Sequence, residues 1–260
     1  MSRKPAYSRA RTAGFTLVEL AVVIVIVSVL LGVVLTPLAT RIQMQQVRDQ
    51  QRTLDEIREA LLGFAQSQGR LPCPDTDGDG QENWPCNVNG VPATAIDELP
   101  YATLGVMATD RWGRRYVYAV TSQLTNIVQT GEPTAATPGE ADTDDRLDLM
   151  DRGRLTLSER RSDKSLATIT TSAAAIVVSL GGNGLGGTDL DGNTLPAPTG
   201  TDELENTDTD ATFMTRIRTD GGTGCNDTAG TSPLCEFDDL VVMVPTPLLL
   251  GRLVQAGRLP

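Results

Sequence analysis

The chain contains no histidine, and only 4% of its 260 residues are aromatic. Without histidine it lacks the means for Ser-His-Asp or Cys-His catalysis and for any zinc site with an imidazole ligand. Carboxylates are plentiful, but no pair of them stands out by its spacing, and no nucleophile has a partner residue. We therefore expect that the protein is not an enzyme.

Positive charge is also scarce, because 22 Lys and Arg residues stand against 33 Asp and Glu residues and give a net charge of −11. Phosphate backbones repel a negative protein, so we expect no nucleic-acid partner. Residues 1–14 carry four basic and no acidic side chains: Arg3, Lys4, Arg9 and Arg11. Removal of this leader would take the side-chain charge from −11 to −15.

A long apolar segment follows the basic leader. Residues 15–38 carry a single charged side chain, Glu19, and as a helix they would measure roughly 36 Å at about 1.5 Å per residue. The hydrocarbon core of a bilayer is about 30 Å thick. We expect residues 15–38 to cross a membrane once, with the leader on the cytoplasmic side.

The charge of Glu19 needs a partner at this depth, because an unpaired carboxylate in lipid costs roughly a few kcal/mol. If the chain were cut between Gly14 and Phe15, the new ammonium group of Phe15 would lie one helical turn from Glu19, in the same chain or a neighbour. The low dielectric constant strengthens such a pair, which would fix the register between subunits. The alternative is an ordinary signal anchor in which Glu19 is incidental.

The heptapeptide from Gly14 to Leu20, Gly-Phe-Thr-Leu-Val-Glu-Leu, follows a short basic leader and resembles the class III signal of type IV pilins and type II secretion pseudopilins. The resemblance implies cleavage after Gly14 by prepilin peptidase, methylation of the Phe15 amine, and docking of each subunit into a filament through Glu19. Pro37 matches a proline that is familiar in type IV pilins, where the helix can loosen as subunits pack. Its alternative role is a simple kink at the membrane boundary.

Polar, helix-forming residues follow from Ala39 to Gln68. Apolar side chains recur among them at helical spacing and predict a one-sided stripe: Val47, Leu54, Ile57, Leu61 and Phe64. Gly69 and Pro72 would end the helix. We expect one helix of about fifty residues, half in the membrane and half packed against a periplasmic domain. The organisation is then a leader (1–14), a transmembrane or filament-core helix (15–38) and a globular domain (39–260).

The four cysteines form two close pairs, Cys73 with Cys86 and Cys225 with Cys235. In a domain exported to an oxidising compartment, an even number with local pairing predicts two disulfides. A zinc ion bound by four thiolates is the alternative, although the spacings differ from the two-residue gap of zinc ribbons.

Alternating carboxylates follow the first cysteine. Asp75, Asp77 and Asp79 precede a glycine, as in the first half of a calcium loop, where carboxylates converge on a hard cation. Position twelve of that loop is Cys86 rather than glutamate, which excludes a complete EF-hand, so Glu82 is the expected fourth ligand. A disulfide across the loop would lower the entropy cost of gathering these ligands. The alternative is an acidic, solvent-exposed turn.

Segments rich in β-branched and aromatic residues predict strands at 115–120, 154–158, 173–180, 212–219 and 237–244. A short amphipathic helix over 248–254 would follow the last of them. The sequence Asp-Arg-Trp-Gly at 110–113, ahead of a tyrosine-rich strand, resembles the start of the sheet in major pseudopilins. This extends the resemblance beyond the leader.

A glycine-rich segment occupies residues 181–191. No Gly-Lys-Ser/Thr sequence follows, so it is not a phosphate loop. The segment resembles the calcium-binding loop of major pseudopilins, where backbone carbonyls and carboxylates hold the ion. The resemblance implies ligands at Leu180, Asn183, Asp189 and Asp191, with Asn183 standing where an aspartate is more usual. A flexible polar loop is the alternative.

These features predict an α+β, pilin-like fold in which a long N-terminal helix, with a membrane half and a packed half, lies across an antiparallel sheet of about four or five strands with long loops. The expected location is the bacterial inner membrane, with a single pass, a cytoplasmic N-terminus and a periplasmic globular domain. After assembly the protein would belong to a periplasmic or cell-surface filament.

The expected function is structural, as a subunit of a type IV pilus-like filament or of a type II secretion pseudopilus. Its expected partners are other pilin or pseudopilin subunits, prepilin peptidase, an inner-membrane assembly platform and membrane lipid, with calcium as the expected cofactor. The alternative is a membrane-anchored, calcium-dependent binding or adhesion module, such as a minor pilin at a filament tip, that recognises its target through the loops at 189–210.

Overall fold

The computed structural model describes residues 16–84, 86, 94–125, 147, 149, 151–228 and 230–259, without the side chains of residues 33–40. The chain divides into two compact units, Met1–Arg48 and Asp49–Pro260, and each is described by itself. The predicted leader, 1–14, lies outside the described residues, as does Phe15.

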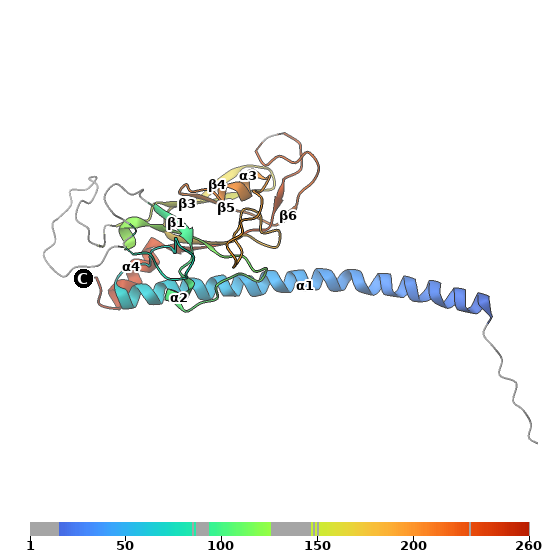
Figure 1. The fold of residues 1–260 in the computed structure, drawn as a ribbon. Helices are drawn as coiled ribbons and strands as arrows, with labels where there is room; N and C mark the ends of the chain where they lie inside the picture. The colour runs from blue at the N-terminus through green and yellow to red at the C-terminus, as the bar shows by residue number, and fades with distance from the viewer. Residues whose placement is uncertain are drawn as a thin grey trace, which may run out of the picture. The chain divides into compact units, whose positions relative to one another are not determined.

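A single helix of 52 residues, α1 (Leu17–Gln68), runs from the first unit into the second, as predicted from the sequence (Figure 1). Its end is set by Gly69, whose positive φ of 77° lets its N–H donate to the carbonyl oxygen of Ala65 at 2.7 Å. Pro37 lies within α1. No helix in the described part of the chain is sufficiently long and apolar to cross a membrane.

The main sheet of the second unit contains six strands: β1 (Thr94–Glu98), β2 (Val117–Thr121), β3 (Leu155–Arg160), β4 (Leu166–Ser179), β5 (Thr212–Thr215) and β8 (Leu240–Pro245). Their order is β1-β2-β4-β3-β5, and β8 also pairs with β4. The predicted α+β class is confirmed, with a sheet in which antiparallel pairs predominate.

One strand pair departs from the antiparallel expectation, because β5 runs parallel to β3. The hairpin of β3 and β4 is antiparallel, with Leu155 at the start of β3 paired to Ala173, and β4 continues past this point to Ser179. The connection 180–211 leaves the end of β4 and returns to the start of β3, where Thr212 pairs with Thr156 and β5 follows the direction of β3. Such a reversal depends on the path of a long connection, which local sequence does not specify.

The shorter elements are α2 (Tyr101–Leu104), η1 (Ser122–Thr125), α3 (Thr201–Glu205), β6 (Thr219–Asp220), β7 (Glu236–Phe237) and α4 (Thr246–Gln255). The predicted strand 212–219 is two strands, β5 and β6. The predicted strand 237–244 is interrupted at Asp238 and Asp239, which separate β7 from β8. Strand β1 was not predicted, whereas the terminal helix is present as α4.

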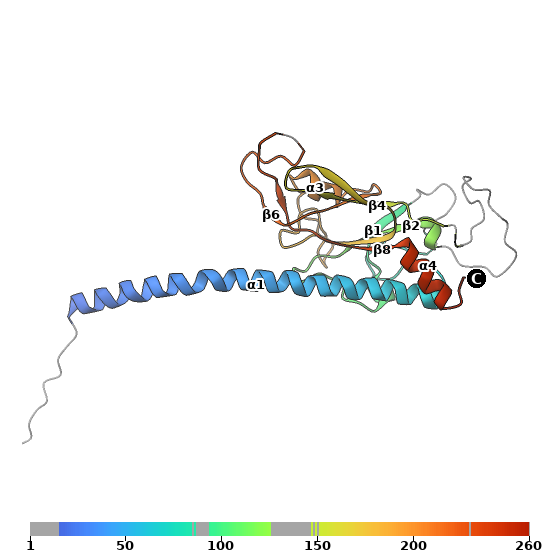
Figure 2. The same cartoon turned by 180° about the vertical axis from the view of Figure 1, so that it is seen from behind.

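The core is built around the C-terminal half of β4. Val177 pairs with Tyr118 of β2 and with Val242 of β8, so β4 lies between these two strands. Alternate β4 residues enter two different apolar clusters, because side chains of a strand point to opposite faces. One cluster packs against the helices, through Leu54, Ile57 and Leu61 of α1 and Leu249 and Leu253 of α4. Both views place α4 beside the end of α1 (Figures 1 and 2).

Both predicted disulfides are present. Cys73 is bonded to Cys86 with a Cα–Cα distance of 5.6 Å, and Cys225 is bonded to Cys235 with a distance of 4.8 Å. No cysteine is free, which leaves no thiol for the zinc alternative.

Replacement of Leu61 by alanine tests the helix stripe. Leu61 is fully buried in the cluster between α1 and the sheet, so Leu61→Ala should lower the free energy of unfolding by about 2 to 5 kcal/mol. Urea denaturation of the full-length protein in detergent, followed by near-UV circular dichroism, measures this change. The matched control is Gln51→Ala on the exposed side of the helix, and equal losses in the two variants would contradict the predicted packing.

Candidate functional site

The N-terminus of α1 contains Glu19, the residue predicted to mediate assembly. Glu19 Oε2 accepts hydrogen bonds from the backbone N–H of Thr16 at 3.1 Å and from its hydroxyl at 3.0 Å. In return, the Thr16 hydroxyl accepts the backbone N–H of Glu19 at 3.2 Å. This reciprocal arrangement is a capping box, which satisfies N–H groups that have no partner within the helix.

The predicted processing residues adjoin this capping box. Gly14 and Phe15 lie outside the described residues, so the pairing between Glu19 and a Phe15 ammonium group stays a prediction. The sequence Thr-x-x-Glu at the start of an apolar run is the known signature of a capping box. It could have been recognised from the sequence, but the predictions concerned only the charge of Glu19.

The acidic loop after Cys73 is organised by a buried aspartate. Asp75 Oδ1 accepts the N–H groups of Asp77 at 3.2 Å and Gly78 at 2.8 Å, while Oδ2 accepts that of Gly80 at 2.6 Å. Gly80 has a φ of 84°, and a Cβ there would lie 2.4 Å from the ring of Tyr101. Only glycine fits this position, and the loop closes around the Asp75 carboxylate as a result.

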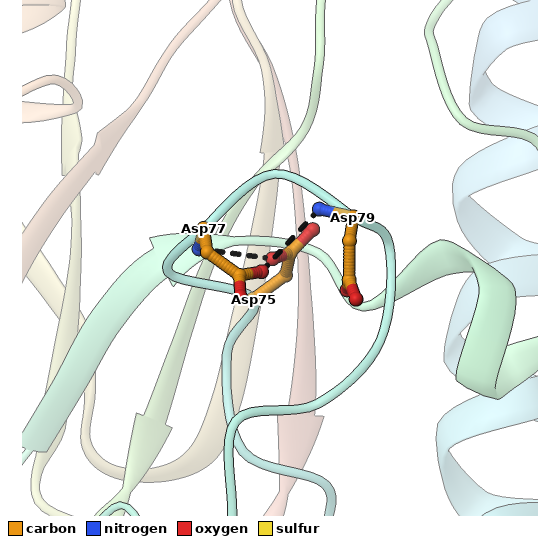
Figure 3. Close-up of side chains that lie close together, drawn as sticks. All are labelled: Asp75, Asp77 and Asp79. Carbon is orange, nitrogen blue, oxygen red and sulfur yellow. Dashed lines mark hydrogen bonds between the residues drawn. The ribbon is translucent and has the colours of Figure 1, made fainter.

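Three of the four predicted calcium ligands lie together. Asp75, Asp77 and Asp79 each offer a carboxylate oxygen within 4.8 Å of the others, and Figure 3 shows their side chains close together on the loop. Glu82 is occupied elsewhere, because both its oxygens bind the guanidinium of Arg70 at 2.7 Å. The Asp75 carboxylate is buried and accepts hydrogen bonds from backbone N–H groups, whereas Asp77 and Asp79 are exposed.

The residues predicted as ligands in the glycine-rich segment make separate sets of hydrogen bonds. Asn183 Nδ2 donates to Glu203 Oε1 at 3.1 Å, and Asn183 Oδ1 accepts the N–H of Leu185 at 3.0 Å. The Asp189 carboxylate instead accepts the N–H of Asp191 and that of Asn193, each at 2.9 Å. The bonds from Asn193 lower the pKa of Asp189. Leu180 is buried.

The structure also brings together three carboxyl groups that the sequence predictions missed: Glu203, Asp238 and Asp239. All three are buried. Burial raises the pKa of Glu203 to about 7 and raises the pKa of Asp239 well above its usual range. The available signal was two adjacent aspartates inside the apolar segment 237–244, which is unusual for a strand core.

The N-terminal segment is the part of the chain that matches a known family. Residues 9–35 match a family model described as the prokaryotic N-terminal methylation motif. The chain carries the N-terminal signal of type IV pilins and pseudopilins. No curated protein and no solved structure gives a significant match to the chain.

The pilin-type signal contains Gly14, Phe15 and Glu19, whereas Pro37 follows it. Proteins with this signal are membrane-anchored precursors that prepilin peptidase processes and that assemble with other pilin subunits. The signal is one found on structural proteins. The α+β domain that follows it is consistent with a pilin-like fold.

Replacement of Asp75 separates its structural role in the loop from metal binding. Asp75→Ala would leave the N–H groups of Gly78 and Gly80 without acceptors, so it should lower the free energy of unfolding by about 3 kcal/mol or more. The measurement is urea denaturation in excess chelator. Asp77→Ala is the matched control, because within the described part of the chain the exposed Asp77 carboxylate accepts a single, long hydrogen bond, of 3.4 Å, from the N–H of Asp79. An equal loss in that variant would show that Asp75 does not organise the loop.

Proposed function

We propose that this protein is a structural subunit of a type IV pilus-like filament or of a type II secretion pseudopilus. The proposal rests on the N-terminal methylation motif at 9–35, which leads directly into α1. The C-terminal end of this helix packs on an α+β domain, through Leu54, Ile57 and Leu61. A filament subunit needs such an arrangement, because its apolar helix must serve assembly while its folded domain remains in water.

Assembly in this proposal proceeds through the N-terminal part of α1. The precursor inserts in the inner membrane with the leader in the cytoplasm, residues 15–38 in lipid and the globular domain in the periplasm. Prepilin peptidase cuts after Gly14 and the Phe15 amine is methylated. An inner-membrane platform then draws the subunit into the filament, where Glu19 pairs with the N-terminus of a neighbour.

Two groups of features bear on the kind of filament. The Trp112-Gly113 turn before β2 and the glycine-rich segment 181–191 favour a pseudopilin of a type II secretion system. The loop closed by the second disulfide, together with the length of the chain, favours a pilin or a minor subunit at the tip.

The second candidate is a membrane-anchored, calcium-dependent binding or adhesion module. Asp77 and Asp79 support it, because they place two exposed carboxylates beside Asp75 on one loop. Calcium favours such oxygen ligands. Thermal melting with and without chelator tests calcium as a cofactor of this module.

The N-terminal peptide distinguishes these functions. Sheared surface filaments and the membrane fraction are analysed by quantitative mass spectrometry. We expect a methylated peptide that starts at Phe15. Its abundance in the sheared fraction identifies a pilus subunit, and its restriction to membranes favours a pseudopilin or a rare initiating subunit. A peptide that retains Gly14 in both fractions would contradict processing and leave the anchored binding module.

Substitution of Glu19 separates its charge from its capping role. Glu19→Gln keeps an acceptor for Thr16 but removes the negative charge, so it should leave cleavage intact and reduce filament incorporation at least tenfold if charge pairing drives docking. Thr16→Ala is the matched control, because it removes the hydroxyl of the capping box and retains the charge. Both variants are measured by immunoblot of sheared and membrane fractions, and normal incorporation of Glu19→Gln would refute the charge pairing.

A further inference from the structure

The second disulfide closes a short ring of the chain that contains a buried aspartate. Cys225 and Cys235 are 10 residues apart in the sequence, and Asp227 lies within the ring that they close. Asp227 is only 2% exposed, although Asn226 and Thr228 on either side of it are exposed. The burial of a carboxylate is costly, so Asp227 needs partners that compensate for its lost hydration.

Asp227 has these partners on three segments of the chain. Its Oδ1 accepts the backbone N–H of Cys235 at 2.9 Å and a guanidinium N–H of Arg216 at 2.8 Å. Its Oδ2 accepts the N–H of Thr201 at 2.9 Å, the hydroxyl of Thr201 at 3.3 Å and the N–H of Asp202 at 3.5 Å. Thr201 and Asp202 are the first two residues of α3, so Asp227 caps this helix from a distant part of the chain.

Buried ion pairs continue from Asp227 through α3 to the sheet. Arg216 binds Asp202 at 2.9 Å as well as Asp227 at 2.8 Å, and Asp202 also binds Arg160 of β3 at 2.7 Å. The side chains of Arg216, Asp202 and Asp227 are at most 1% exposed. Loss of one member would leave a buried charge without compensation, which costs far more than the loss of a surface pair. The position of α3 therefore depends on Asp227.

The other end of α3 covers the edge of the sheet. The order of the strands ends at β5, which pairs with no described strand other than β3. Asn206, directly after α3, donates from Nδ2 to the carbonyl oxygen of Met214 at 3.0 Å, and its Oδ1 accepts the N–H of Met214 at 2.8 Å. The amide side chain thus occupies backbone groups of β5 that would otherwise be open to pairing with another chain.

The helix between these two contacts has little stability of its own. It contains five residues, whereas an isolated helix shorter than about 12 to 15 residues is marginal in water. The place of α3 is therefore set by the contacts at its ends, with Asp227 at the start and Asn206 at the other end. The disulfide between Cys225 and Cys235 in turn restricts the conformations of the segment that carries Asp227.

We propose that the Cys225–Cys235 disulfide is a redox-sensitive lock that holds α3 over the edge of β5. In the oxidised chain the closed ring keeps Asp227 at the start of α3. Reduction opens the ring and lets Asp227 turn to water, so that α3 and Asn206 leave the edge of β5. The lock does not rest on the filament function, because its residues lie outside the N-terminal methylation motif.

The chemical step is thiol–disulfide exchange with a dithiol as the reductant. A thiolate of the dithiol attacks the sulfur of Cys225, which is the more accessible half of the bond because Cys235 is only 4% exposed. The S–S bond breaks, and Cys235 leaves as a thiolate and takes up a proton. The second thiol of the reductant then displaces Cys225, so the protein disulfide gains two electrons and two protons while the dithiol is oxidised to a disulfide.

The test uses dithiothreitol as the dithiol and the full-length protein in detergent. Mass spectrometry after alkylation identifies the reduced disulfide, and hydrogen exchange is measured for the peptides that contain α3 and Met214. Reduction of Cys225–Cys235 should speed exchange in both peptides at least tenfold, and reoxidation should restore it. A folded protein whose second disulfide resists dithiothreitol would overturn the redox-sensitive lock.

Serine variants separate the two disulfides. Replacement of both ring cysteines, Cys225→Ser with Cys235→Ser, should speed exchange in α3 at least tenfold without reductant. Exchange in the C-terminal half of β4, 173–179, should stay slow in this variant, because that part of the core remains folded. The matched control is Cys73→Ser with Cys86→Ser, which removes the other disulfide and should leave α3 protected.

Replacement of Asp227 tests the lock with the ring closed, and it decides the question if the serine variants do not fold. Asp227→Asn keeps the shape of the side chain but removes its charge, so it should speed exchange in α3 at least tenfold. Asp220→Asn is the matched control, because the Asp220 side chain is 95% exposed. The proposal is overturned if α3 stays as protected as in the wild type when the ring is opened or Asp227 is replaced. It is also overturned if β4 exchanges as fast as α3, since the ring would then support the whole domain.

Discussion

The globular domain depends on the position of β4 between two strands. Val177 pairs on one side with Tyr118 and on the other with Val242, while helices cover one face of the strand. Because alternate residues supply separate apolar clusters, a slip by one residue would exchange the two faces. The end of the strand is fixed by the Ser179 hydroxyl, which donates to Asp110 at 2.7 Å. The glycine-rich segment begins immediately after this point, so its placement follows from the register of β4.

Local sequence predicted the parts of the fold that local interactions determine. The stripe containing Leu54 and Leu61 and the left-handed residue Gly69 specify a helix and its end within a few neighbouring residues. The parallel strand β5 was not predicted, because its direction depends on the connection 180–211. The break at Asp238 has a similar cause, since its carboxylate is held by backbone groups more than fifty residues earlier in the chain.

The candidate sites also differ in whether neighbouring residues or contacts between distant segments form them. Alternating aspartates identified the Asp75 loop from the sequence, but the pairing of Glu82 with Arg70 depends on a contact across the fold. Glu203 and Asp238 are far apart in the chain, so their proximity has no local signature. The N-terminal signal around Glu19 could be recognised from the sequence because its residues are consecutive and their order alone identifies the motif.

The capping box at the start of α1 gives Glu19 a partner within its own chain. Thr16 and Glu19 satisfy each other's hydrogen-bonding groups before any second subunit is present. A positive group from elsewhere would have to displace hydrogen bonds to the Glu19 carboxylate that are themselves charge-assisted. The Thr16 side chain and backbone thus set the hydrogen bonds that any second partner of the Glu19 carboxylate has to replace.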